Sequence, residues 1–326
     1  MSYRIVIIQS GFLGDAVLAS GMLRMVAMAH PSWEIGFLVR KEYAPLFEGH
    51  PAIFQLHGFE KKRKDGMELM TAELRDAGYN AALLPHRSAR SAMLARRAGI
   101  PKRVGFRQSD APWLLTDRVE YRIGLHETER NARLLARIGV EAPGGDRLPW
   151  LVPSADALAA MHARFNDGRP IVLIAPGSVW ATKRWREDGY AGVAESLRRE
   201  GKRVILIGSG GERELCERIA GKAGMGEEDI ACGILSLPEV LALISMARRV
   251  VTNDSAPLHL AESVATPVTA IFGPTVPEFG FGPLRPHSSV VERRDLSCRP
   301  CGIHGGDRCP IGTHECMRDL NVRIEI

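Results

Sequence analysis

The chain has 326 residues, a formal net charge of +5, 45% hydrophobic residues and 6% aromatic residues. This length exceeds the usual size of one hydrophobic core, so two domains are expected. No segment approaches the roughly 20 apolar residues that span a bilayer, and the first residues lead into a strand rather than a signal peptide. We therefore expect a cytoplasmic protein whose six cysteines are reduced thiols.

The first predicted strand lies in the segment 4–10, whose four consecutive apolar residues are of the kind found in buried parallel strands. It leads into Gly11-Phe12-Leu13-Gly14-Asp15, and apolar residues at helical spacing then predict a helix over 16–29. Asp15 thus lies where open α/β sheets bind ligands. Two interpretations stay open from these residues: a helix-capping carboxylate, or a catalytic group beside glycines that let another molecule approach.

Further strand-like runs at 35–39 and 81–84, separated by helical stretches such as 66–77, indicate βαβ order. The segment 81–109 has no acidic residue and holds seven basic ones: Arg87, Arg90, Arg96, Arg97, Lys102, Arg103 and Arg107. Such a patch favours an anionic partner, although charge alone does not identify it and could also serve solubility. Nucleic acid is disfavoured, because no nucleic-acid-binding motif accompanies the patch and aromatic residues are few.

A helix over 155–165 and the polar stretch 166–170 predict a linker region, which places domains at 1–154 and 170–326 around a linker at 155–169. The runs 171–175 and 203–207 again read as buried parallel strands followed by turns and helices. The fold class expected is therefore α/β, with two doubly wound Rossmann-like domains.

Three segments of the second domain could hold an anion. Pro176-Gly177-Ser178, with Lys183-Arg184 nearby, offers hydroxyl, amide and ammonium donors or is a solvated loop. The turn 207–212 departs from the dinucleotide pattern G-x-G-x-x-G, because Arg213 takes the third glycine position, so a nicotinamide site has little support. The third segment, 252–259, predicts a helix start that can bind phosphate, or one where Asp254 caps the helix and His259 lies in the core.

The last part of the chain is rich in cysteine. Cys298, Cys301, Cys309 and Cys316 are spaced C-x2-C-x7-C-x6-C, with His304 and His314 nearby. These side chains could bind zinc, but the second C-x2-C pair of a zinc ribbon is missing. We therefore predict a thiol-rich structural loop without metal, and Cys216 and Cys232 as ordinary small core residues.

Taken together, the motifs around Asp15, Ser178 with Lys183, and Asp254 with His259 resemble the ADP-heptose:lipopolysaccharide heptosyltransferases of glycosyltransferase family nine. The resemblance covers nearly the whole chain, and the cysteine-rich tail looks like the subfamily called heptosyltransferase II, which adds the second heptose of the inner core. It implies a GT-B fold, in which two Rossmann-like domains face a central cleft. The N-terminal domain would bind the acceptor and the C-terminal domain ADP-heptose, without any cofactor.

The resemblance also implies roles for individual residues. Asp15 would be the general base of an inverting transfer. The residues implied to bind the donor are Ser178, Lys183, Asp254, Ser255, Ala256 and His259, where the family usually has glycine at the position of Ala256. From their place after a strand in the basic segment, we expect His86, Arg87 and Arg90 to contact the anionic inner-core acceptor. We expect Gly14, beside Asp15, to contact it as well.

Alternatives remain at this point. They are heptosyltransferase I or another family-nine transferase with a different acceptor, a GT-B sugar-nucleotide epimerase, a non-catalytic anion-binding module and, furthest back, a nicotinamide dehydrogenase. Since a lipid-linked acceptor resides at a membrane, we also expect peripheral contact with the cytoplasmic face of the inner membrane through Arg96, Arg97, Lys102 and Arg103.

Overall fold

The computed structural model describes residues 3–141 and 147–324. The chain divides into two compact units, Met1–Val152 and Pro153–Ile326, and each unit has its own parallel sheet. Among the described residues, no helix combines the length and hydrophobicity that a membrane span needs.

The sheet of the first unit has six strands, all paired in parallel, in the order β3-β2-β1-β4-β5-β6. The strands are β1 (Arg4–Ile8), β2 (Glu34–Arg40), β3 (Gln55–Phe59), β4 (Ala81–Leu84), β5 (Lys102–Phe106) and β6 (Asp117–Val119). This is the strand order of the Rossmann fold, whose ligand site lies where the order reverses, here between β1 and β4. The predicted strands in the segment 4–10 and at 35–39 and 81–84 are confirmed as β1, β2 and β4.

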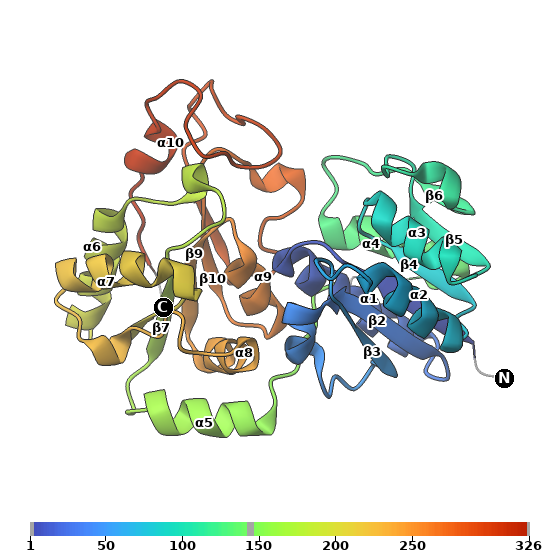
Figure 1. The fold of residues 1–326 in the computed structure, drawn as a ribbon. Helices are drawn as coiled ribbons and strands as arrows, with labels where there is room; N and C mark the ends of the chain where they lie inside the picture. Colours follow the sequence, from blue (N-terminus) through green and yellow to red (C-terminus); the bar gives the residue numbers. More distant parts are fainter. Residues whose placement is uncertain (1–2, 142–146, 325–326) are drawn as a thin grey trace. The chain divides into compact units, whose positions relative to one another are not determined.

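The helices of this unit are α1 (Leu13–Ala29), α2 (Gly66–Asp76), α3 (Ala89–Arg97) and α4 (Glu127–Leu135), with short 3₁₀ segments η1 (Lys41–Phe47), η2 (Pro112–Leu114) and η3 (Ala136–Ile138). Figure 1 shows α1 to α3 in the blue to blue-green part of the ribbon beside the strands that they connect. Helix α1 begins three residues earlier than predicted, so Asp15 lies inside its first turn. Helix α4 packs against α1, and the charge of Glu127, its first residue, acts on Asp15.

The sheet of the second unit has five parallel strands in the order β11-β10-β9-β7-β8. They are β7 (Ile171–Ala175), β8 (Arg203–Leu206), β9 (Arg249–Asn253), β10 (Val268–Phe272) and β11 (Ser289–Glu292). The order reverses between β7 and β9, so the loops that follow these two strands meet at one edge of the sheet. Ser178 follows β7 and Asp254 follows β9.

The helices of the second unit are α5 (Ala155–Phe165), α6 (Glu187–Arg199), α7 (Arg213–Lys222), α8 (Leu237–Met246), α9 (Ala256–Ser263) and α10 (Glu315–Arg318), with 3₁₀ segments η4 (Ala181–Lys183), η5 (Gly210–Glu212), η6 (Glu227–Asp229) and η7 (Pro277–Phe279). The predicted helix over 155–165 is confirmed as α5, and it packs against α8 (Figure 1). Ser154 begins α5 by accepting a hydrogen bond from the Ala157 N–H.

The central strands explain the continuous apolar runs in the sequence. Residues 5–8 of β1 and 172–174 of β7 are completely shielded from solvent. Helices on both faces of a parallel sheet bury both sets of side chains, so such strands do not alternate between polar and apolar residues. The polar ligand-binding groups must therefore come from the loops at the strand ends.

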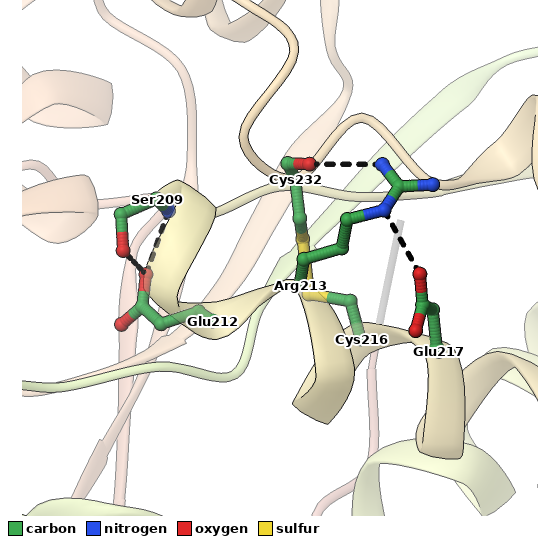
Figure 2. Close-up of a disulfide and its surroundings, with 6 residues drawn as sticks. All are labelled: Ser209, Glu212, Arg213, Cys216, Glu217 and Cys232. Atoms are coloured by element: carbon green, nitrogen blue, oxygen red, sulfur yellow. Dashed lines mark hydrogen bonds and ion pairs between the residues drawn. A yellow bond between two sulfur atoms is a disulfide. The ribbon is translucent and has the colours of Figure 1, made fainter.

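The prediction that all six cysteines are reduced thiols is wrong. Cys216 on α7 and Cys232, in the segment after η6, form a disulfide with their Cα atoms 6.8 Å apart (Figure 2), so only four of the six cysteines are free. Both side chains are fully buried, as predicted for core residues. The pair forms because the Leu206–Ile230 bridge and a hydrogen bond from Arg213 to the Cys232 carbonyl hold the segment against α7, a proximity that sequence spacing does not reveal.

Candidate active site

Asp15 is the centre of the polar site in the first unit. Its Oδ2 accepts a hydrogen bond of 3.3 Å from the Phe12 N–H, so the carboxylate does cap α1. The loop passes close to it: a Cβ on Gly11 would lie 3.0 Å from Asp15 Oδ2 and 2.8 Å from Gln9 Oε1. Glycine at position 11 therefore lets the chain turn tightly around the carboxylate.

The surroundings of Asp15 raise its proton affinity. Burial, followed by the negative charge of Glu127, raises the pKa of Asp15 to about 6, against the lowering effects of the Phe12 N–H, Arg40 and Arg87. A carboxyl with this pKa is mostly ionised at neutral pH but accepts a proton more readily than an ordinary aspartate, which suits a general base. Capping and catalysis are thus compatible roles for this side chain.

Two guanidinium groups near Asp15 rest on aromatic rings. Arg40 lies over Phe12 and Tyr43, with 5.4 and 5.7 Å to the ring centroids, and its Nε donates to the Ser10 carbonyl. Arg87 lies over Tyr121 at 4.4 Å. Stacking of this kind holds the flat face of the guanidinium while leaving its edge free to donate hydrogen bonds.

Of the other predicted acceptor residues, Gly14 and His86 border the loop that carries Asp15. A Cβ on Gly11 would also lie 3.3 Å from the His86 ring, which borders the loop before Asp15, and burial with the charges of Lys61 and Arg40 lowers the pKa of His86 to about 4. His86 is therefore neutral at pH 7 and can only take part in neutral hydrogen bonds. Gly14 precedes Asp15 on α1, and Arg90 lies within electrostatic range of Lys61.

In the second unit, Lys183 and Asp254 form an ion pair. Lys183 Nζ lies 2.5 Å from Asp254 Oδ2, and Thr275 Oγ1 donates to the same oxygen at 2.7 Å. All three side chains are largely buried. Asp254 is thus no helix cap, and its negative charge keeps the Lys183 ammonium beside the start of α9.

Asn253 connects the loops that carry these residues. Its Nδ2 donates to the Pro176 and Gly177 carbonyls, while its Oδ1 accepts from the Trp185 N–H and the Tyr190 hydroxyl. The loop after β7, the segment after η4 and the end of β9 are therefore held together by one buried amide. Ser178 lies in this loop and is largely buried, and its carbonyl accepts from Arg184 Nε.

Helix α9 begins at Ala256, with Ser255 as its N-cap residue but without a side-chain capping hydrogen bond. Backbone N–H groups at such a helix start attract anions. His259, one turn further along, is buried, with its ring 6.4 Å from that of Phe281. The structure therefore brings Lys183, Asp254, Ser255 and Ala256 to one edge of the second sheet, with Ser178 on the neighbouring loop.

The glycine-rich turn after β8 is not arranged to bind a phosphate. Glu212 Oε2 accepts from both the N–H and the hydroxyl of Ser209, so the carboxylate already occupies the backbone donor of this turn (Figure 2). A Cβ on Gly177 would lie 1.8 Å from Glu212 Oε1, so Gly177 is required where the two loops touch. This geometry gives no support to a nicotinamide site.

The cysteine-rich tail packs against the loop that carries Lys183. The Thr182 N–H and hydroxyl both donate to the Gly306 carbonyl, and His314 Nε2 lies 2.8 Å from the Thr182 carbonyl. No group of three or more His, Cys, Asp or Glu side chains in residues 3–141 and 147–324 is arranged to hold a metal ion. The tail therefore forms one wall of the Lys183 site.

Several residues of these sites escaped the sequence analysis: Arg40, Tyr121, Glu127 and Thr275. Arg40 ends β2, the neighbour of β1, and could have been found from the strand order. The other three carry no motif, since Tyr121 and Glu127 follow an unpredicted strand and Thr275 follows another. Their proximity depends on tertiary packing alone.

Comparison with known proteins identifies the family. Residues 68–305 match the profile of glycosyltransferase family 9 (heptosyltransferase). The chain belongs to glycosyltransferase family 9. This heptosyltransferase-family chain is an α/β glycosyltransferase, in agreement with the resemblance noted in its motifs.

Individual relatives cover most of the family 9 chain. Lipopolysaccharide heptosyltransferase 1 of Pseudomonas aeruginosa is 27% identical over 91% of this chain and 86% of its own length. Lipopolysaccharide heptosyltransferase 2 of Escherichia coli is also 27% identical, over 85% of this chain and 84% of its own length. Sequence identity alone thus does not separate these two kinds of heptosyltransferase.

A solved structure supports the predicted GT-B fold class. The E. coli ADP-heptose lps heptosyltransferase II matches with a TM-score of 0.75 and 25% identity, covering 90% of this chain and 91% of that chain. The predicted fold class, with two Rossmann-like parallel sheets, is confirmed.

Proposed function

We propose that this family 9 enzyme transfers L-glycero-D-manno-heptose from ADP-heptose to the first heptose of the lipopolysaccharide inner core, heptosyl-Kdo2-lipid A. The observation that carries the proposal is Asp15, a carboxylate of raised pKa at the switch point of the first sheet, flanked by Arg40 and Arg87. Relatives named as lipopolysaccharide heptosyltransferases support the class of donor and acceptor. The resemblance of the cysteine-rich tail to heptosyltransferase II favours the second heptose.

The proposed reaction is a single displacement with inversion. Asp15 removes the proton from the acceptor hydroxyl as that oxygen attacks the anomeric carbon of the donor heptose. The bond from this carbon to the phosphate oxygen breaks, and ADP leaves with the bonding electrons. Asp15 later releases the proton to water.

The leaving diphosphate gains negative charge, which the second unit is suited to stabilise. We assign this role to Lys183, Ser178 and the backbone N–H groups at Ser255 and Ala256. Asp254 cannot stabilise a phosphate by charge, so we assign it to sugar hydroxyls and to holding Lys183 at 2.5 Å. His259 is buried in the first turn of α9. The acceptor then belongs to the unit that carries Asp15, with Gly14, His86 and Arg90 beside it.

Mass spectrometry of the reaction with ADP-heptose tests the proposal. Kdo2-lipid A and its monoheptosylated form are offered as separate acceptors. We expect one heptose to be added only to the monoheptosylated form. Addition to Kdo2-lipid A instead would reassign the enzyme to the first heptose, and no addition to either would contradict the proposed acceptor.

Contact with the cytoplasmic face of the inner membrane is a second part of the proposal. Trp113 on η2 is 71% exposed, and η2 packs against α3, whose last turn carries the exposed Arg96 and Arg97. We name Arg96, Arg97, Lys102 and Trp113 the basic-aromatic surface. Basic residues attract anionic lipid, and tryptophan favours the membrane interface.

A further inference from the structure

Tyr121 lies between β6 and α4, and its ring contacts two arginines. The guanidinium carbon of Arg87 lies 4.4 Å from the ring centroid, and that of Arg130 lies 4.3 Å from it. Phe106 meets the ring edge-on, with 5.0 Å between the centroids. A half-buried ring with these neighbours is a rigid support rather than a mobile surface side chain.

The hydroxyl of Tyr121 is fixed by a buried ion pair. It donates to Glu127 Oε2 at 2.9 Å and accepts from Arg130 Nη1 at 2.7 Å. Arg130 also donates to Glu127 Oε2 at 2.7 Å, and their side chains are only 1% and 8% exposed. Because both charges are buried and paired, the Glu127–Arg130 pair fixes the orientation of the Tyr121 ring.

Arg87 extends from the loop after β4, and its backbone carbonyl accepts from the Asp110 N–H. Its guanidinium forms no ion pair with any described residue, although its charge reaches Asp15. The Tyr121 ring therefore supports one flat face of the Arg87 guanidinium, and the N–H groups at the edge of the guanidinium are left for a ligand. A guanidinium edge matches a carboxylate or a phosphate with two parallel hydrogen bonds.

These contacts suggest a role for Tyr121 that rests on the proposed function. We propose that Tyr121, fixed by Glu127 and Arg130, is a positioning residue that holds Arg87 beside Asp15, where Arg87 binds a carboxylate or phosphate of the acceptor. The acceptor is the partner because Asp15, in the same unit, takes the proton from its hydroxyl. An anion held by Arg87 would orient that hydroxyl towards the base.

Calorimetric binding of deacylated monoheptosyl-Kdo2 saccharide tests this role without depending on turnover. Tyr121→Leu removes the ring and should weaken binding about 3- to 30-fold, the range expected for a cation–π contact. Tyr121→Phe keeps the ring but loses the hydroxyl, and should weaken binding less. Arg87→Lys keeps the charge but not the flat stacked edge, and should resemble Tyr121→Leu.

A matched control is available on α5, where the Arg164 guanidinium lies 5.1 Å from the Phe165 ring centroid. Arg164→Leu removes a stacked arginine from the other unit and should not change acceptor binding. For every variant, ADP-heptose affinity should stay at the wild-type value. Tyr121→Leu and Tyr121→Phe both remove a hydrogen bond from the buried Glu127–Arg130 pair, so both should lower the thermal unfolding midpoint. A variant that also loses ADP-heptose affinity acts on the whole fold.

Chemically altered acceptors identify the bound anion. One acceptor carries its Kdo carboxylates as methyl esters, and another lacks its phosphates. The modification that removes the partner of Arg87 should weaken acceptor binding to the wild-type protein. It should not weaken binding to Arg87→Lys any further, because the modification and the substitution then delete the same contact. Independent, additive losses with both modified acceptors would overturn the assignment of Arg87 to an acceptor anion.

Other outcomes also decide the question. Unchanged acceptor binding in a folded Tyr121→Leu protein would overturn the inference while leaving the proposed function intact. Equal losses for Tyr121→Phe and Tyr121→Leu would overturn the role of the ring. A wild-type protein that does not bind the saccharide would contradict the proposed function itself, together with the inference that rests on it.

Discussion

At the residue scale, the carboxylate of Asp15 has two tasks that are often considered exclusive. It caps α1 through the Phe12 N–H, and its raised pKa suits it to accept a proton. Replacement by asparagine keeps the size of the side chain and an oxygen acceptor for the cap. The variant therefore separates capping from proton transfer.

We expect Asp15→Asn to lower kcat by about 10²- to 10⁴-fold, the usual contribution of a general base, with unchanged ADP-heptose affinity. Mass spectrometry of product formation and calorimetry with ADP-heptose measure the two quantities. Asp76→Asn, an exposed position at the end of α2, is the matched control. Wild-type turnover in Asp15→Asn would remove this residue from the proposed mechanism.

The pKa of Asp15 also sets a pH dependence. Because the base must be deprotonated and its pKa is raised to about 6, kcat/KM should be lost as the pH falls through 6, about tenfold per unit below it. An ordinary aspartate would keep its activity down to about pH 4. Initial rates from pH 4.5 to 8, with recovery checked after return to pH 7, would contradict this expectation if the decline began near pH 4.

Lys183 allows a second test at the scale of single residues. Lys183→Ala removes the charge-assisted contact that we propose with the donor phosphate, and it leaves the buried Asp254 without its 2.5 Å partner. A contact of this kind contributes about 1.5–3 kcal/mol, so calorimetry should show ADP-heptose binding weaker by about 10- to 150-fold. Lys222→Ala, on an exposed face of the same unit, should bind normally. Equal affinities of the two variants would exclude Lys183 from the phosphate site.

At the element scale, the cysteine-rich tail packs closely against η4. Gly305 lies so close to it that a Cβ would be 2.6 Å from Trp180 Cβ and 2.9 Å from Lys183 Cγ. At the next residue, Gly306, a Cβ would meet only the Arg308 carbonyl, at 3.8 Å. An added methyl group would therefore clash with its neighbours at Gly305 but not at Gly306.

We expect Gly305→Ala to displace η4, to weaken ADP-heptose binding and to cost about 1–3 kcal/mol of unfolding free energy, as overpacking does. Gly306→Ala should be close to wild type in both respects. Calorimetry and denaturant unfolding measure them. If the two variants behave alike, the tail does not position Lys183.

The elements also show how far sequence reasoning reaches. Strands β1, β4 and β7 and helix α5 follow from apolar runs and helix-start signals, and the motifs after β1, β7 and β9 point to the two candidate sites that we propose. The Tyr121–Glu127–Arg130 cluster and the Cys216–Cys232 disulfide depend on which loops tertiary packing brings together. No local pattern encodes such contacts, so they could not be predicted from a single sequence.

At the scale of the whole molecule, the chain carries a net charge of +5, and the acid-free segment 81–109 lies in the first unit. Not every basic residue there is free to meet a membrane. Arg103, expected to contact lipid, donates to the carbonyls of Leu114, Ile100 and Pro101 and so supports η2 from within. A test of membrane contact should therefore leave Arg103 in place.

We expect reversal of Arg96 and Arg97 to glutamate, combined with Trp113→Ala, to reduce binding to anionic liposomes by at least about 30-fold. Each basic residue near such a surface contributes about 1 kcal/mol, and charge reversal adds repulsion. Sedimentation with phosphatidylglycerol vesicles at low and high salt measures this, because screening should weaken wild-type binding in the same way. Reversal of the exposed Arg164 and Arg199 in the second unit changes the net charge equally. If this control loses binding to the same extent, net charge rather than the basic-aromatic surface governs the contact. If the triple variant still binds the vesicles at low salt, the basic-aromatic surface does not face the membrane.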